Sequence, residues 1–119
     1  MNKCKVVVVD DEYDLLQAIA GLLEDEGYDV DAFSSGPSAI KHLKEQQTPP
    51  SVILLDVMMP VLSGVDVLRQ LRGHEATRSV PVVMMSAADP PAGDIGWDAF
   101  LKKPFDIKKL LSTVERYTA

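Results

Sequence analysis

The sequence predicts an α/β domain in which a parallel β-sheet is covered by helices on both faces. Short apolar runs rich in Val and Ile recur along the chain, without the alternation that marks a half-exposed strand. Such runs suit strands that are buried on both faces of a parallel sheet. Segments with helical spacing of apolar residues separate them, so strand and helix alternate along the chain.

The first half of the chain supplies a strand, a helix, a strand and a helix in turn. Residues 6–9 are four valines and predict the first strand. An apolar stripe with helical spacing follows, and Gly27 is a plausible stop for that helix. Residues 29–33 alternate between polar and apolar side chains and predict a shorter strand. Gly36 and Pro37 then open a second helix.

The second half repeats the pattern. Residues 52–55 predict the third strand, and Ser63 and Gly64 open the third helix. Residues 80–85 predict the fourth strand, which a proline interrupts, and residues 99–101 predict a weaker fifth strand between helix signals. One more apolar stripe predicts the last helix; it consists of Ile107, Leu110, Leu111 and Val114.

One segment disturbs the alternation. A helix is due between the fourth and fifth strands, but residues 89–96 contain two prolines and two glycines. Proline lacks a backbone N–H and clashes with the preceding helical turn, so this fourth helix is expected to be shortened or irregular. Trp97 could anchor a partner beside it or cover the space that the helix leaves, and we favour the second interpretation.

Composition bounds the class of protein. With 119 residues, 46% of them hydrophobic and 25% charged, residues 1–119 are expected to form one globular domain. The formal net charge of −6 argues against direct binding of nucleic acid or an anionic membrane surface. Cys4, the single cysteine, cannot form an intrachain disulfide, and we see no signal peptide. A cytoplasmic location is the default expectation.

Polar residues follow the predicted strands where the strands end. Asp10 and Asp11 follow the first, Asp56 the third, Ser86 the fourth and Lys103 the fifth. Ligands of open parallel sheets bind outside the carboxyl ends of the strands. Each residue alone could be a helix cap or a solvated charge, but together they suggest a site. Crowded carboxylates with no His or Cys nearby favour a hard ion, and Mg²⁺ suits such a site better than Ca²⁺.

The same set of groups suits phosphoryl chemistry. A divalent ion, an ammonium group and a hydroxyl on one rim would neutralise and position phosphoryl oxygens. A carboxylate nucleophile would give an aspartyl phosphate. His42 and His74 lie far in sequence from the acidic residues and are expected to be solvated.

Four motifs resemble the receiver domains of bacterial two-component response regulators. They are Val-Val-Asp-Asp-Glu at 8–12, Leu-Leu-Asp-Val-Met-Met-Pro at 54–60 with Gly64 following, Met-Ser-Ala at 85–87, and Lys-Lys-Pro-Phe at 102–105. The resemblance covers essentially the whole chain. It implies a flavodoxin-like, doubly wound sheet of five parallel strands in the order 2-1-3-4-5. It also implies a phosphorylation switch rather than a turnover enzyme.

The resemblance implies a phosphoacceptor and a metal site. Asp56 matches the aspartate that accepts the phosphoryl group. Asp10 and Asp11 match the acidic pair that holds Mg²⁺, with Asp11 and Asp56 as direct ligands and Asp10 acting largely through water. The backbone carbonyl of Met58 matches the remaining protein ligand. Mn²⁺ is expected to substitute for Mg²⁺.

Four further residues match positions of the family. Lys103 matches the lysine that pairs with the phosphoryl group, and Pro104 the proline whose preceding peptide bond is typically cis. Ser86 matches the hydroxyl that contacts the phosphoryl oxygen. Phe100 matches the aromatic that moves inward when the hydroxyl does, although its residue type alone would suggest an ordinary half-buried strand aromatic. Lys102 has no matching role and is expected to be a surface cation.

The resemblance also implies partners. The phosphoryl donor would be a sensor histidine kinase or a histidine phosphotransfer domain, and the switch would control an unknown downstream protein or output domain. Dimerisation through the face of the fourth helix is in doubt because that helix is disturbed. Three alternatives are less well supported: a small aspartyl-phosphate phosphatase, a flavin carrier, and a degenerate receiver that signals without phosphate.

Overall fold

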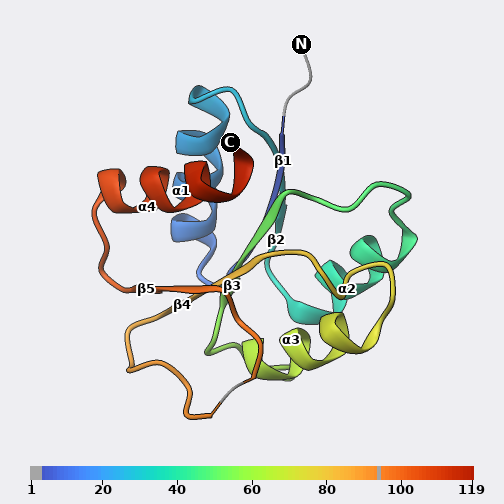
Figure 1. Ribbon diagram of the computed structural model, residues 1–119. Coiled ribbons are helices and arrows are strands. Elements are labelled where there is room, and N and C mark those ends of the chain that lie inside the picture. The colour runs from blue at the N-terminus through green and yellow to red at the C-terminus, as the bar shows by residue number, and fades with distance from the viewer. Residues whose placement is uncertain (1–3, 94) are drawn as a thin grey trace.

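A computed structural model describes residues 4–93 and 95–119 as a five-stranded sheet between two layers of helices (Figure 1). The order of the strands in the sheet is β2-β1-β3-β4-β5, and every neighbouring pair is parallel. The predicted fold class and strand order are therefore confirmed. The strands are β1 (Lys5–Val9), β2 (Asp29–Phe33), β3 (Val52–Asp56), β4 (Val82–Ser86) and β5 (Ala99–Lys102). The helices are α1 (Tyr13–Asp25), α2 (Gly36–Glu45), α3 (Gly64–Gly73) and α4 (Ile107–Thr118).

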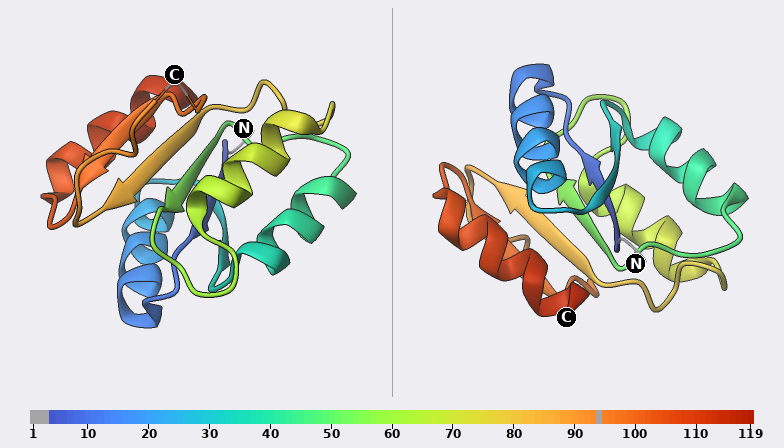
Figure 2. Two further views of the ribbon diagram at one scale, coloured as in Figure 1. Left: turned by 90° about the horizontal axis from the view of Figure 1, so that it is seen from below. Right: turned by 90° about the horizontal axis from the view of Figure 1, so that it is seen from above.

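The helices divide into two layers, one on each face of the sheet (Figure 2). Alternate residues of β1, β3 and β4 point to opposite faces, so the valine-rich strands fill two cores. The core that faces α1 and α4 includes Val8, Leu54 and Met85 from the strands. The core that faces α2 and α3 includes Leu55 and Met84. Burial on both faces explains why each of these strands has a run of four apolar residues rather than an alternating pattern.

Side-chain caps fix where three of the helices begin. The Ser35 and Ser63 hydroxyls accept the backbone N–H groups of the third residues of α2 and α3, at 3.4 and 3.3 Å. The Asp106 carboxylate accepts that of Lys109 at 2.7 Å, at the start of α4. These bonds satisfy donors that have no partner within the helix. Gly27, with a φ of 96°, follows the end of α1 as predicted.

The helix expected between β4 and β5 is missing from the described part of that segment. Residues 87–93 and 95–98 contain no helix, so the helix numbered α4 is the last helix of the sequence. Trp97 lies half-buried against the core beneath α2 and α3. This packing agrees with its interpretation as a cover for the space that a helix would fill.

The prediction that both histidines are solvated was wrong for His42. Nε2 of His42 lies 2.9 Å from a carboxylate oxygen of Asp31, and its ring packs at 4.9 Å from that of Phe33. His74 is half-buried at the C-cap of α3. His42 lies on α2, which packs against the edge strand β2, so its partners Asp31 and Phe33 come from a different element.

Among the described residues, no helix combines the length and apolar character needed to cross a membrane.

Candidate functional site

The polar residues predicted to form a site do meet at the carboxyl edge of the sheet. Asp10 directly follows β1, whereas Asp56 and Ser86 are the last residues of β3 and β4. Lys103 follows the last residue of β5. Asp10, Asp56 and Ser86 are buried, and Asp11 is exposed. Parallel strands place these chain positions at one edge, which is why the sequence pattern could predict their proximity.

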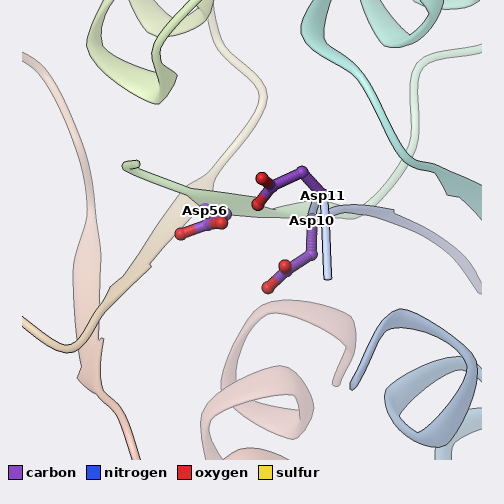
Figure 3. A group of neighbouring side chains, drawn as sticks. All are labelled: Asp10, Asp11 and Asp56. Atoms are coloured by element: carbon purple, nitrogen blue, oxygen red, sulfur yellow. The ribbon is translucent and has the colours of Figure 1, made fainter. Parts of the chain in front are cut away.

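Three carboxylates form a group that could hold a metal ion. Asp10, Asp11 and Asp56 each offer an oxygen, and the three oxygens lie within 4.8 Å of one another (Figure 3). Asp10 and Asp11 extend from the end of β1 and Asp56 from the neighbouring β3. Oxygen ligands of this kind suit a hard divalent cation, and the exposure of Asp11 leaves one side of the group accessible to water.

Lys103 supplies positive charge inside the group. Its Nζ lies 2.8 Å from Asp10 and 3.5 Å from both Asp56 and Glu12. Only 12% of its side chain is exposed. Burial alone would lower the pKa of this ammonium group, but the hydrogen bond to Asp10 and the charges of the three acids together outweigh it and raise the pKa. Lys103 is therefore held as a cation between carboxylates.

The site raises the pKa of the Asp56 carboxyl group. Burial raises its pKa to about 7, and the negative charge of Asp10 contributes to the rise. The charge of Lys103 and the backbone N–H of Met58, which donates to Asp56 at 3.3 Å, act in the opposite direction. A cation bound among the three carboxylates would oppose the rise, because positive charge favours the ionised form.

Backbone contacts hold the acids in place. The amide of Asp10 donates to the carbonyl of Phe33 at 3.1 Å, and its side chain accepts the amide of Glu12 at 2.9 Å. The loop after Asp56 returns tightly, since the amide of Gly64 donates to the carbonyl of Val57 at 2.8 Å. A methyl group on Gly64 would collide with the backbone carbonyl oxygen of Asp56. Only glycine permits this close approach.

The remaining predicted residues lie around this group. The buried hydroxyl of Ser86 accepts the amide of Ala88 at 3.0 Å. Phe100 is half-buried on β5, and the side chain of Met58 is 65% exposed. The peptide bond between Lys103 and Pro104 is cis, the isomer that the resemblance implies.

Two lysines adjacent in sequence occupy contrasting environments. Lys102 is exposed and pairs at 2.9 Å with Asp89, which agrees with its prediction as a surface cation. Lys103 is buried among acids. Sequence reasoning gave no role to Glu12, although it contacts Lys103; its place in the acidic run was the only available signal.

A pocket opens beside Lys103, between the start of α1 and the loops that follow β4 and β5. Its volume is about 360 Å³. The lining is mainly apolar, with one acid and one lysine: Glu12, Leu15, Ala87, Lys103, Pro104 and Phe105. The tyrosine at position 13, at the start of α1, has 65% of its surface exposed. The acidic group therefore borders a surface that a partner can approach.

Fold and site together define a flavodoxin-like α/β domain with an acidic site beside a buried lysine. Residues 6–115 match the family model described as the response regulator receiver domain. The chain belongs to this family of two-component signalling proteins, whose members are signalling modules.

Curated relatives support the assignment. The chain is 34% identical over 114 residues to the sensory transduction protein RegX3 of Mycolicibacterium smegmatis, covering 92% of this chain and 48% of that protein. It is 36% identical over 120 residues to the alkaline phosphatase synthesis transcriptional regulatory protein PhoP of Bacillus subtilis, covering 97% and 48%. The chain thus spans about half the length of these relatives.

Solved structures agree. The chemotaxis protein CheY4 of Vibrio cholerae superposes with a TM-score of 0.89 at 28% identity, covering 98% of this chain and 99% of that one. The receiver domain of sensor histidine kinase PA1611 from Pseudomonas aeruginosa superposes with a TM-score of 0.86 at 27% identity, covering 98% of each chain. That structure has a magnesium ion coordinated in its active site cleft.

Proposed function

We propose that this chain is a Mg²⁺-dependent receiver that accepts a phosphoryl group on Asp56 from a phosphohistidine of a sensor histidine kinase or phosphotransfer domain. The observation that carries the proposal is the placement of Asp56, a buried carboxylate 3.5 Å from the Lys103 ammonium and grouped with two further acids. A carboxylate in such a setting can attack phosphorus while nearby positive charge neutralises the phosphoryl oxygens.

The transfer exchanges one bond to phosphorus for another and needs no further reactant. An oxygen of ionised Asp56 forms a bond to phosphorus, and the bond from phosphorus to the donor's imidazole nitrogen breaks. The nitrogen keeps the electron pair of the broken bond. Lys103 would then shift from Asp10 toward the new phosphoryl oxygens, which its position between both carboxylates supports. The hydroxyl of Ser86, at the neighbouring strand end, would hydrogen-bond to the same group.

The acids fit the metal that the family implies. Asp11, Asp56 and the backbone carbonyl of Met58 would hold Mg²⁺ directly and Asp10 through water, and Mn²⁺ would substitute. When bound, the ion would neutralise charge on the phosphoryl oxygens and favour the ionised form of Asp56. In its absence, Lys103 is the nearest cation to Asp56 and offsets part of the repulsion between the carboxylates.

The donor would dock beside the acids, over the start of α1. The mainly apolar pocket next to Lys103 and the exposed Tyr13 ring lie there and would contact the donor's helices. Once Asp56 is phosphorylated, Ser86 would move toward the phosphoryl group and Phe100 would turn inward, so that the population shifts between two packings. The shift would control a downstream protein or output domain in the cytoplasm, with Cys4 kept reduced.

Intact-mass spectrometry with acetyl phosphate tests the proposal. We expect the mass of one phosphoryl group to be added in the presence of Mg²⁺ and not in its absence. Asp56→Asn should take up none, whereas Asp66→Asn, a control at a carboxylate that accepts the Ser63 hydroxyl at the start of α3, should behave as the parent does. Failure to detect an adduct with the parent protein under any of these conditions would refute the proposal.

Met58 offers a test of the later step, in which water hydrolyses the aspartyl phosphate. Its exposed side chain belongs to the residue whose amide contacts Asp56, so it can shield the acyl phosphate from attacking water. Replacement by asparagine, which can hydrogen-bond to water, should change the half-life of the phosphorylated protein by about two- to tenfold, equivalent to about 0.4 to 1.4 kcal/mol in activation free energy. Release of inorganic phosphate measures it. Equal half-lives for the parent and Met58→Asn would show that this side chain does not shield the site.

A further inference from the structure

The guanidinium of Arg72, at the end of α3, joins this helix to the segment that precedes β5. Nε and Nη2 both donate to the carbonyl of Gly96, at 3.0 and 2.8 Å. Nη1 donates to the carbonyl of Val80 at 2.8 Å and to that of Arg78 at 3.1 Å. Nη2 also contacts the Asp98 carboxylate at 3.0 Å. With its side chain 22% exposed, Arg72 makes these charge-assisted bonds largely shielded from water.

Asp98 continues the connection into the sheet. The carboxylate oxygen that meets Arg72 also accepts the amide of Val82 at 2.8 Å. The amide of Asp98 donates to the carbonyl of the same valine at 2.8 Å. Residues 96 and 98 are therefore fixed both to α3 and to the start of β4. The residue between them is Trp97.

Trp97 covers part of the core on the sheet face that carries α2 and α3. Its indole packs against the core beneath α2 and α3, and its ring centroid lies 6.1 Å from that of Phe100, at an angle of 54°. Phe100 pairs in register with Met84, which lies two residues before Ser86 on β4. Side chains two residues apart on a strand point to the same face. Ser86, Phe100 and Trp97 thus share one side of the sheet.

We propose that Arg72 and Trp97 together replace the fourth helix in the switch. Arg72 acts as a positioning residue that holds the Trp97 side chain in a fixed position. When Asp56 is phosphorylated, the Phe100 ring moves and packs against this fixed indole. The inference rests on the proposed function, because it assumes phosphorylation at Asp56. It goes beyond it by naming the two residues that transmit the change in a chain whose fourth helix is missing from the described residues 87–93 and 95–98.

The emission of Trp97, the single tryptophan, tests the inference directly. The protein is treated with acetyl phosphate and Mg²⁺ while intact mass is followed in the same samples. We expect the emission spectrum to change in proportion to the adduct. Phe100→Leu should lose most of this change, since the ring that moves is gone. Arg72→Gln should form the adduct to the same extent but lose most of the emission change.

Arg69→Gln is the matched control. Arg69 lies on the same helix, but its side chain is exposed and its ion pair with Asp66 is long, at 3.9 Å. This variant should keep the full emission change. A parent protein that forms the adduct with constant emission would overturn the inference and leave the proposed function intact. An Arg72→Gln variant with the full change would overturn it as well. Absence of the adduct in the parent would instead refute the proposed function.

Hydrogen exchange of the parent protein gives a second test, which does not depend on any variant folding. With Arg72 in place, we expect the amide of Asp98, which donates to the carbonyl of Val82, to keep its protection after phosphorylation. The amide of Ala88, which donates to the Ser86 hydroxyl, should change its protection. Loss of protection at the Asp98 amide on phosphorylation would show that the segment around Trp97 moves, contrary to the inference.

Discussion

Without Mg²⁺, Lys103→Met should lower the free energy of unfolding by about 3 kcal/mol, because breaking a buried ion pair leaves an uncompensated charge. The charge left behind is that of Asp10, whose side chain is completely buried and 2.8 Å from the lysine. The loss would also raise the pKa of Asp56 further, since Lys103 opposes the rise. Urea unfolding followed by circular dichroism measures the change.

Lys102→Met is the matched control for this experiment. It removes the same functional group one residue away, where the lysine is exposed and pairs with the exposed Asp89. We expect no measurable change in stability, because exposed ion pairs contribute little. Saturating Mg²⁺ should recover much of the loss in Lys103→Met, since it would supply the missing positive charge. Equal stability of the two variants in metal-free buffer would contradict the assigned role of Lys103.

Asp56→Asn should stabilise the metal-free domain above pH 7. The folded protein holds the pKa of Asp56 at about 7, mainly through burial, whereas an unfolded aspartate titrates near 3.9. Ionising Asp56 in the fold therefore costs a few kcal/mol, because each pKa unit corresponds to about 1.4 kcal/mol. Asparagine has nearly the same shape and no charge, and it escapes this cost.

The pH dependence of this difference has a definite sign. Between about pH 4 and pH 7 the folded state keeps the proton of Asp56 and the unfolded state loses it, so rising pH destabilises the parent protein through this group. The advantage of Asp56→Asn should therefore grow across this window and stay constant above it. Thermal unfolding at a series of pH values, with chelator present, measures it. An advantage that is constant from pH 4 to pH 8 would show that the pKa of Asp56 is not raised in the fold.

Most of the fold could be predicted because each element carries its own signal. The strands β1 and β3 each contain four consecutive apolar residues, and burial on both faces of the sheet requires such runs. Gly36 and Pro37 indicated the start of α2, and Ser63 with Gly64 indicated the start of α3. The two prolines of residues 89–96 indicated where a helix would fail, although the sequence could not show whether any part of it would remain.

The candidate site could be predicted as a set of residues but not as a geometry. Strand ends place Asp10, Asp56 and Lys103 at one edge, and the topology brings them together whatever the details of packing. The contact of Lys103 with Glu12 depends on side-chain directions, which no spacing rule gives. The bonds of Arg72 were likewise missed, because an arginine near a helix end resembles any solvated cation and its partners Gly96 and Asp98 lie 24 and 26 residues away.

The loop that stands where the fourth helix was expected has a practical consequence for protein engineering. Residues 87–93 are mostly exposed, and the segment beyond them is held by Arg72 independently of the loop itself. Exposed loop tips tolerate inserted sequence far better than helices packed on a core. A peptide tag or a small fluorescent domain could therefore be inserted near Pro91 without interrupting a helix or strand. This loop, which follows Ser86, thus offers an attachment point for reporters of the proposed phosphorylation.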